Sequence, residues 1–228
     1  MSKKIFIILL FLGAGIALQA QTFNPYTSHS PKVKNKGSIV HSINLTGGLY
    51  APEMDYWNDS YLPSSGNSDE FGSSLVFGGN INFIILPSIR ARVGASYWSD
   101  KVSGSGAGLS ELKVSFTRFS FGGLYTPEFA TFDGFQVYTG VELYLYDINN
   151  KVDMKSESGT ISSEDQNGHD YSFAPLLGIE RLVSDHFLVG AEFSYMIGDY
   201  NQGEIVESIK NKVSINGPQL TLSFGYKF

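Results

Sequence analysis

The chain has 228 residues, of which 17% are charged and 14% aromatic, and it contains 25 Gly and no Cys. This length suits a single domain. The lack of Cys excludes a disulfide scaffold, a thiolate metal site, a Cys nucleophile and a lipid-modified Cys anchor. The formal net charge of −6 argues against nucleic acid as a partner, because a phosphate backbone requires a basic surface.

The first 20 residues have the features of a secretory signal peptide. Lys3 and Lys4 precede an apolar run over 5–17, and Ala20 ends a suitable cleavage site. The run is short for a transmembrane helix, which needs roughly 20 apolar residues, although retention as an anchor is the alternative. We expect 1–20 to be the signal peptide, 21–37 a polar, basic leader, and 38–228 the folded domain.

From Ser38 onwards the sequence alternates with a period of two, which is typical of strands with two different faces. The first three predicted strands cover 39–50, 74–85 and 89–98. Each has one apolar face and one face of small or polar residues, and Arg90 and Arg92 belong to the polar face of the third strand.

The fourth predicted strand, 112–125, changes its parity. Leu112, Val114 and Phe116 have even numbers, whereas Phe119, Phe121 and Tyr125 have odd numbers. A β-bulge near Thr117 and Arg118 would reconcile the two halves, because one extra residue moves every later side chain to the opposite face. We therefore expect a bulge at this position.

Four more strands complete the pattern, at 135–146, 171–182, 187–197 and 219–228. Pro175 counts mildly against a central strand, since proline cannot donate to the ladder. Short connections follow the second, fourth and sixth strands, and long polar ones follow the others: 51–72, 99–111, 147–170 and 198–211. An even number of strands with short turns at one end and long loops at the other is typical of outer-membrane barrels. The predicted fold is an all-β, eight-stranded, antiparallel, up-and-down transmembrane β-barrel with both termini in the periplasm.

A soluble β-sandwich or lipocalin-like barrel would also alternate. Such a barrel turns its apolar residues inward and its charges outward. Here one face is rich in Gly and Ser and the other in Phe, Leu and Val. Lipid around the barrel explains that division, because a narrow lumen has room only for small and polar residues.

Two segments carry a resemblance to a known family. The C-terminal Leu220-Thr221-Leu222-Ser223-Phe224-Gly225-Tyr226-Lys227-Phe228, and Phe119-Ser120-Phe121-Gly122-Gly123-Leu124-Tyr125-Thr126-Pro127, resemble small OmpA-like or porin-like outer-membrane barrels of the Bacteroidota type. The resemblance covers roughly 38–228 and implies a Gram-negative outer-membrane location. It also implies that Phe224, Tyr226 and Phe228 form the signal read by the barrel-assembly machinery. It says little about function, because such barrels serve many roles. Relatives with a peptidoglycan-binding domain differ, since this sequence stops at the barrel.

Six charged residues fall on the inward face of the predicted barrel. They are Arg90, Arg92, Arg118, Glu142, Glu180 and Glu192. A buried charge is costly unless it is paired, and an eight-stranded lumen is only wide enough for side chains to fill. We expect a salt-bridged plug and a closed, structural lumen; a gated ion path through the plug is the alternative.

Catalysis and metal binding find weak support in the sequence. A lipid hydrolase would need a Ser and His pair with an acidic partner, and only His169, beside Asp170 and Ser172, lies near the predicted outer rim. The loop carboxylates, such as Asp153, lack the spacing of an EF-hand. We expect no catalytic residue, no cofactor and no metal.

The predicted outer loops carry the remaining candidates. Tyr50, Tyr56, Trp57 and Tyr61 lie at or beyond the end of the first strand, where aromatics form a membrane girdle or a protein contact. We expect a non-enzymatic, closed outer-membrane barrel that acts structurally or as an accessory subunit of a larger assembly. A narrow porin-like channel is the first alternative, and a lipid-modifying enzyme the second. The expected partners are outer-membrane lipid, the assembly machinery and other outer-membrane proteins.

Overall fold

The computed structural model describes residues 39–104, 108–155, 161–202 and 211–228. The predicted signal peptide and leader lie outside the described residues. None of the helices in the described part of the chain is long and apolar enough to cross a membrane.

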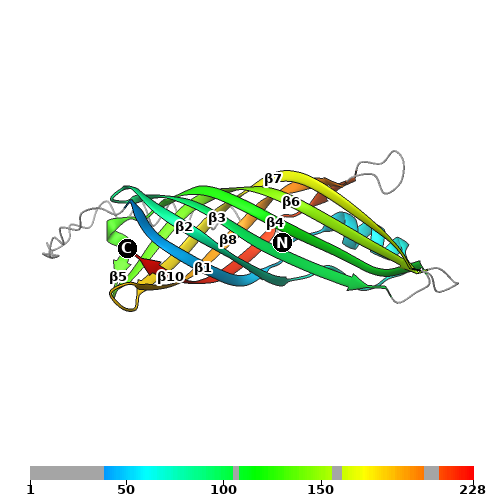
Figure 1. The fold of residues 1–228 in the computed structure, drawn as a ribbon, viewed down its shortest axis with the longest axis horizontal. Coiled ribbons are helices and arrows are strands. Elements are labelled where there is room, and N and C mark those ends of the chain that lie inside the picture. Colours follow the sequence, from blue (N-terminus) through cyan, green and yellow to red (C-terminus); the bar gives the residue numbers. More distant parts are fainter. Residues whose placement is uncertain (1–38, 105–107, 156–160, 203–210) are drawn as a thin grey trace, which may run out of the picture. The chain divides into compact units, whose positions relative to one another are not determined.

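Eight antiparallel strands form a closed ring (Figure 1). Each strand pairs with its neighbours in the ring, and β10 pairs with both β8 and β1, which closes the sheet. The predicted eight-stranded fold is confirmed. The strands of the ring are β1 (Val40–Tyr50), β2 (Ser74–Leu86), β3 (Ile89–Ser103), β4 (Gly108–Tyr125), β6 (Phe135–Lys155), β7 (Ile161–Leu182), β8 (Phe187–Gln202) and β10 (Gly217–Lys227).

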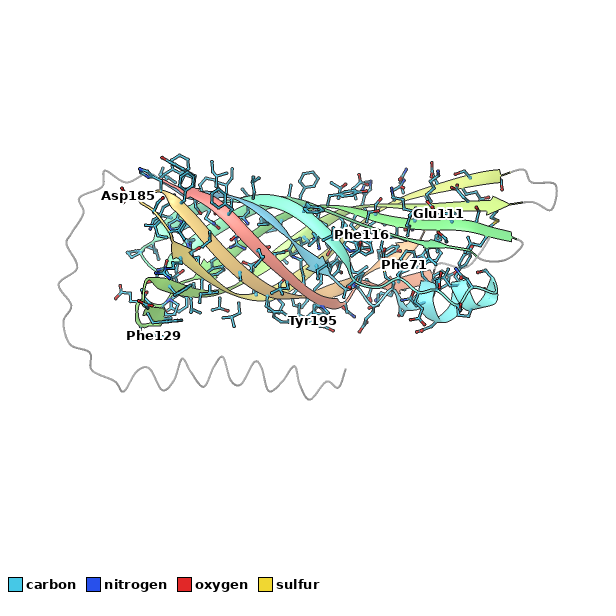
Figure 2. All side chains as sticks on the ribbon, turned by 90° about the horizontal axis from the view of Figure 1, so that it is seen from below. Phe71, Glu111, Phe116, Phe129, Asp185 and Tyr195 are labelled. Atoms are coloured by element: carbon cyan, nitrogen blue, oxygen red, sulfur yellow. The ribbon has the colours of Figure 1, made fainter. Side chains whose placement is uncertain are left out.

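Short helical turns and short strands lie at the two ends of the ring. At the end with the short turns, the 3₁₀ turn η3 (Glu128–Ala130) precedes β5 (Thr131–Phe132), which pairs with the start of β6. At the other end lie the π-helical turn η2 (Tyr56–Tyr61) and α2 (Leu62–Ser64), and β9 (Asn211–Ser214) extends the ladder along the end of β8. Figure 2 labels Asp185 and Phe129 at the first end, and Phe71 toward the second.

The half of the ring near the short turns has an apolar outer face. Leu45 on β1 and Leu222 on β10, for example, are 71% and 65% exposed. A surface of this kind around a whole barrel is stable in lipid rather than in water. On β6 this outward apolar series runs from Phe135 to Leu145, about the 9–11 residues that a tilted strand needs to cross a bilayer.

Beyond that band, the polarity of the two faces of the barrel wall is reversed: the inner face is apolar and the outer face is polar. On β4, Leu112, Val114 and Phe116 are fully buried inside the ring, on the same side as Arg118. The pairing of β4 with β3 runs without a break from Tyr125 to Glu111. The predicted bulge at Thr117 and Arg118 is therefore wrong, and the parity change marks the point where the strand leaves the membrane.

The strands are also longer than the sequence pattern predicted. Most of the long connections predicted at 99–111 and 147–170 belong to β3, β4, β6 and β7. On β6, the inward Ile148 and Val152 are buried, whereas Asp147 and Asp153 face outward. This is the pattern of a soluble sheet, and it shows that the barrel wall continues into water.

Candidate functional site

The lumen of the barrel is the candidate site, and its membrane-embedded half is polar. Arg90 and Arg92, two positions apart on β3, both point inward because side chains alternate along a strand. The carboxylates facing them come from across the ring: Glu142 on β6, Glu180 on β7 and Glu192 on β8. All five side chains are largely buried.

Arg90 has one carboxylate partner. Its Nη1 lies 2.7 Å from Glu180 Oε1, and its Nη2 donates a hydrogen bond of 3.0 Å to Thr126 Oγ1. Its Nη1 is also 3.4 Å from His41 Nδ1. The single ion pair is thus supplemented by neutral groups from β1 and from the turn after β4.

Arg92 is shared between two carboxylates. Its Nη1 lies 2.6 Å from Glu192 Oε2 and 3.3 Å from Glu142 Oε1, while its Nε donates to Asn82 Oδ1 at 3.0 Å. The Tyr144 hydroxyl donates to Glu142. Each charged group therefore has several partners, as burial of an ion pair requires.

Tyr138 joins the two arginine clusters. Its ring centroid lies 5.3 Å from the Arg90 guanidinium carbon and 5.5 Å from that of Arg92, and its hydroxyl donates to Glu192 at 2.9 Å. The sequence offers one signal for this role, because Tyr138 and Glu142 are both at even-numbered positions of the same strand and therefore share its inward face.

Asparagine side chains from β1 and β2 line the lumen at the same height as these charged residues. Asn44 on β1 donates to Asn80 Oδ1 at 2.8 Å, and Asn82 donates to Ser42 Oγ at 3.0 Å. The period-two pattern puts these side chains on the polar faces of β1 and β2, but the contact of Asn82 with Arg92 depends on the register between strands, which that pattern does not supply. The result is one hydrogen-bonded layer across the lumen.

Arg118 lies apart from this layer. Its guanidinium carbon is 5.1 Å from the Tyr50 ring centroid and 5.6 Å from that of Tyr144, and its Nε donates to Ser96 Oγ at 3.0 Å. Among the described residues no carboxylate lies within ion-pair distance of it. The structure thus brings together five of the six predicted charges and places the sixth among aromatic rings.

The second half of the lumen is filled by aromatic and aliphatic side chains. Trp98 stacks on Phe116 with 4.9 Å between ring centroids, and Phe116 contacts the edges of Tyr146 and Tyr200. Figure 2 labels Phe116 in this part of the barrel. Within the described part of the chain, 21 buried residues form this apolar core.

The segment that contains η2 and α2 closes the outer end of that core. Trp57 is fully buried, and its Nε1 donates to the Tyr200 hydroxyl at 2.7 Å. The Asp55 carboxylate accepts from the backbone of Ser214 at 2.7 Å, and the Glu53 carboxylate from its hydroxyl at 2.7 Å. These polar contacts fix the segment to β9.

The aromatic cluster at the outer rim therefore differs from both predicted roles. Tyr50 and Trp57 are buried in the lumen and belong neither to a membrane girdle nor to an exposed contact surface. Tyr56 and Tyr61 are partly buried and pack against Trp57. These four aromatic residues lie in the half of the ring that is surrounded by water, and there the apolar side chains point into the lumen.

The structure does not bring His169, Asp170 and Ser172 together as a catalytic triad. His169 Nδ1 lies 3.5 Å from Asp147 Oδ1, and both side chains are largely exposed. Ser172 instead points into the lumen and donates to the Tyr146 hydroxyl at 2.8 Å. Among the described residues, no group of three His, Cys, Asp or Glu side chains could hold a metal ion.

The C-terminal aromatics lie on the lipid-facing side of β10. Phe224, Tyr226 and Phe228 are 40–53% exposed, and Tyr226 contacts the edge of Phe228 with 5.0 Å between centroids. The Phe228 amide donates to the His41 carbonyl at 3.1 Å. Their reading by the assembly machinery stays a prediction.

Known structures share this fold. No family model matches the chain, and no curated protein matches its sequence. Neisserial surface protein A is 13% identical with a TM-score of 0.51, over 84% of this chain and 98% of that one. The N-terminal barrel of Pseudomonas aeruginosa OprF is 13% identical (TM-score 0.46, 82% and 98% covered). Yersinia pestis Ail, solved with sucrose octasulfate, is 12% identical (TM-score 0.46, 84% and 100% covered). The chain thus has the fold of the small outer-membrane barrels.

Proposed function

We propose that this chain is a non-enzymatic, integral outer-membrane protein with a closed lumen that serves as a structural or accessory subunit of an outer-membrane assembly. The observation that carries the proposal is the filling of the lumen at two successive levels. Paired charges occupy the membrane-embedded half, and an aromatic core with Trp57 at its outer end occupies the rest.

The physical argument against a conducting pore rests on the partners of each charge. A water-filled lumen leaves charged side chains hydrated, and their pairing is then worth about 1 kcal/mol or less. Here the Arg92 and Glu142 side chains are 6% and 4% exposed. An ion would have to break these pairs and then cross a layer of closely packed aromatic and aliphatic side chains, in which polar groups such as the Tyr200 and Tyr146 hydroxyls already have hydrogen-bond partners within the protein.

Planar-bilayer recording tests the proposal. The purified chain should show no steady single-channel conductance, because both levels exclude water. A large-pore porin inserted under the same conditions is the positive control. A stable ohmic conductance from the wild-type chain would support the narrow porin-like channel instead.

The lipid-modifying enzyme is the weaker alternative. The Ser172 hydroxyl points inward, to Tyr146, and so lies on the opposite face of β7 from the exposed His169 and Asp147 pair. Mass spectrometry of lipid A with and without the gene tests this alternative, and we expect identical spectra.

We further propose that the short turns and both ends of the mature chain face the periplasm. The support is the polar, extended wall at the end with the long connections, which suits the cell exterior. Single Cys residues at the exposed Ser68 and Ser162 should react with an impermeant maleimide on intact cells, whereas one at Ser184 should react only after lysis. The native chain has no competing Cys. The reverse pattern of labelling would invert the topology.

We also propose that the barrel-assembly machinery is a partner during biogenesis, with Phe224, Tyr226 and Phe228 as its recognition signal. Support comes from their position at the end of the last strand, on the outer face. The proposed location implies outer-membrane lipid as the solvent of the apolar band.

A further inference from the structure

Three lysines lie side by side on the outer face of the barrel wall, beyond the lipid band. In the register of the sheet, Lys101 on β3 is directly opposite Lys113 on β4, and Lys113 is directly opposite Lys151 on β6. Residues directly opposite one another have Cβ atoms about 4.5–5.5 Å apart. The three ammonium groups therefore belong to one row across three adjacent strands, which we call the lysine row.

The side chains of the lysine row point away from the lumen. Leu112 and Val114, which flank Lys113 along β4, are buried inside the ring, and successive side chains of a strand alternate between its two faces. The side chains of Lys101 and Lys151 are 62% and 44% exposed. The lysine row is thus accessible to the surroundings of the barrel at this height.

The nearby carboxylates leave the centre of the lysine row without an ion pair. Lys101 lies 3.1 Å from Glu111, and Lys151 lies 3.5 Å from Asp153. No carboxylate among the described residues lies within ion-pair distance of Lys113. Exposed pairs such as the outer two contribute about 1 kcal/mol or less, so an anion with a higher charge can compete for these lysines.

The groups on the two sides of the lysine row differ. Away from the lipid band, the next outward row contains Asp153 and Glu111, which Figure 2 labels. Toward the lipid band, the next outward row is neutral and can form hydrogen bonds: Ser99, Ser115, Asn149 and Asn167. Asp165 on β7 is opposite Lys151 at the end of the lysine row. An anion above the membrane surface therefore has hydroxyl and amide groups on one side and ammonium groups on the other.

The height of the lysine row above the lipid band suits an anionic head group. Thr117 lies at the boundary on β4, and Lys113 is four residues beyond it. Four residues cover about 13 Å along a strand, or about 10 Å along the membrane normal for a strand tilted by 35–45°. Head groups extend about 5–8 Å beyond the hydrocarbon. The flexible stem of a lysine allows its ammonium group to reach them.

We propose that the lysine row binds phosphate groups in the head groups of the lipid around the outer rim of the barrel. Like charges directly opposite one another in a sheet are destabilising, and a phosphate beside Lys113 replaces that repulsion with charge-assisted hydrogen bonds. This inference rests on the proposed function and deepens it, because it names the lipid chemistry that the closed barrel recognises at its wide end.

Native mass spectrometry of the full chain in detergent tests the proposal. The probe is lipid A with two phosphates, and the same lipid with both phosphates removed is the control. We expect saturable binding of the phosphorylated form. The dephosphorylated form should bind at least about tenfold more weakly, because each lysine near an anionic lipid surface contributes about 1 kcal/mol.

Inorganic pyrophosphate in the same assay distinguishes a lipid head group from a soluble phosphate. It offers two phosphates without acyl chains, so it should bind more weakly than the phosphorylated lipid. Binding of pyrophosphate without binding of the lipid would overturn the assignment to lipid.

A matched pair of variants separates the lysine row from general charge attraction. Lys113→Gln should weaken binding of the phosphorylated lipid at least about threefold, and replacement of all three lysines by Gln at least about tenfold. Lys212→Gln removes one exposed lysine from β9 and should have less than about a twofold effect. Lys113→Arg should retain binding. Heat-modifiable migration checks the folding of each variant.

The outcomes that would overturn the lysine row are distinct from those that would overturn the proposed function. Equal effects of Lys113→Gln and Lys212→Gln, equal binding of the dephosphorylated lipid, or a lack of binding by a barrel that does not conduct would overturn the lysine row alone. A conducting wild-type barrel would overturn the closed lumen, whatever the lipid does.

Discussion

The three inward arginines of the lumen have different numbers of carboxylate partners. Arg92 has Glu142 and Glu192, Arg90 has Glu180, and Arg118 has none among the described residues. Removal of one partner from a buried pair leaves the other charge uncompensated, at a cost of about 3–5 kcal/mol. The number of partners therefore predicts how strongly each carboxylate supports the fold.

Glu180→Gln should destabilise the barrel more than Glu192→Gln. The first change leaves Arg90 with neutral partners only, and we expect a loss of about 3–5 kcal/mol. The second leaves Arg92 paired with Glu142, so the loss should be distinctly smaller. Urea unfolding followed by heat-modifiable migration measures both, with the exposed Glu128→Gln as a control. Equal losses for the two variants would mean that the pairs do not act separately.

Arg118 shows that a buried arginine can be accommodated without an ion pair. The faces of the Tyr50 and Tyr144 rings lie at 5.1 and 5.6 Å from its guanidinium carbon, and such contacts contribute about 0.5–2 kcal/mol each. The residue lies where the polar layer gives way to the aromatic core. It is therefore the contact between the two levels of the lumen.

At the scale of elements, strand β4 contains the boundary between lipid and water. Its outward residues are Phe119 and Phe121 on one side of that boundary, and Lys113 and Thr117 on the other. Its inward residues change in the opposite sense, from Arg118 to Phe116. One continuous strand thus carries apolar side chains on its outer face in the lipid band and on its inner face beyond that band.

The sequence predicted the eight strands of the ring and the inward face of five paired charges, because alternation within the lipid band is simple. The prediction from alternation failed at the positions where the surroundings of a strand change from lipid to water. The parity change at Thr117 was interpreted as a bulge, since the rule for alternation assumes one environment per strand. Trp57 could not be placed either, because its burial depends on Tyr200, which is distant in the sequence. The choice of carboxylate by each arginine depends on register across the ring, which alternation does not supply.

A charge placed on either side of the boundary on β4 tests its position. Phe121 faces outward between Val93 and Leu143, so Phe121→Lys should cost about 2–4 kcal/mol if the site is near the bilayer midplane. Thr117 faces outward beside Asp147, and Thr117→Lys should cost about 1 kcal/mol or less. Unfolding in lipid vesicles measures both. Similar costs would place the boundary elsewhere on the strand.

At the scale of the whole molecule, each of the two halves of the lumen is expected to block the passage of water and ions by itself. The lower level is the membrane-embedded half, which contains the paired charged side chains. The upper level is the half beyond the lipid band, which is filled by the apolar core. They come from the same strands, yet they share few residues. Charge pairing in the lower level can therefore be lost without opening the upper level.

Weakening of either level alone should leave the barrel closed. The lower-level variant combines Arg92→Ala, Glu142→Ala and Glu192→Ala, which removes an arginine together with both of its carboxylates and so leaves none of them unpaired. The upper-level variant combines Trp57→Ala and Phe116→Ala, and each large-to-small change should cost about 3–5 kcal/mol. Folding of both is checked by heat-modifiable migration before recording. We expect no conductance from either variant in planar bilayers, because the remaining level still excludes water. Steady conductance from the folded lower-level variant would show that the charged layer is the only seal, and the same result from the upper-level variant would show that the aromatic core is.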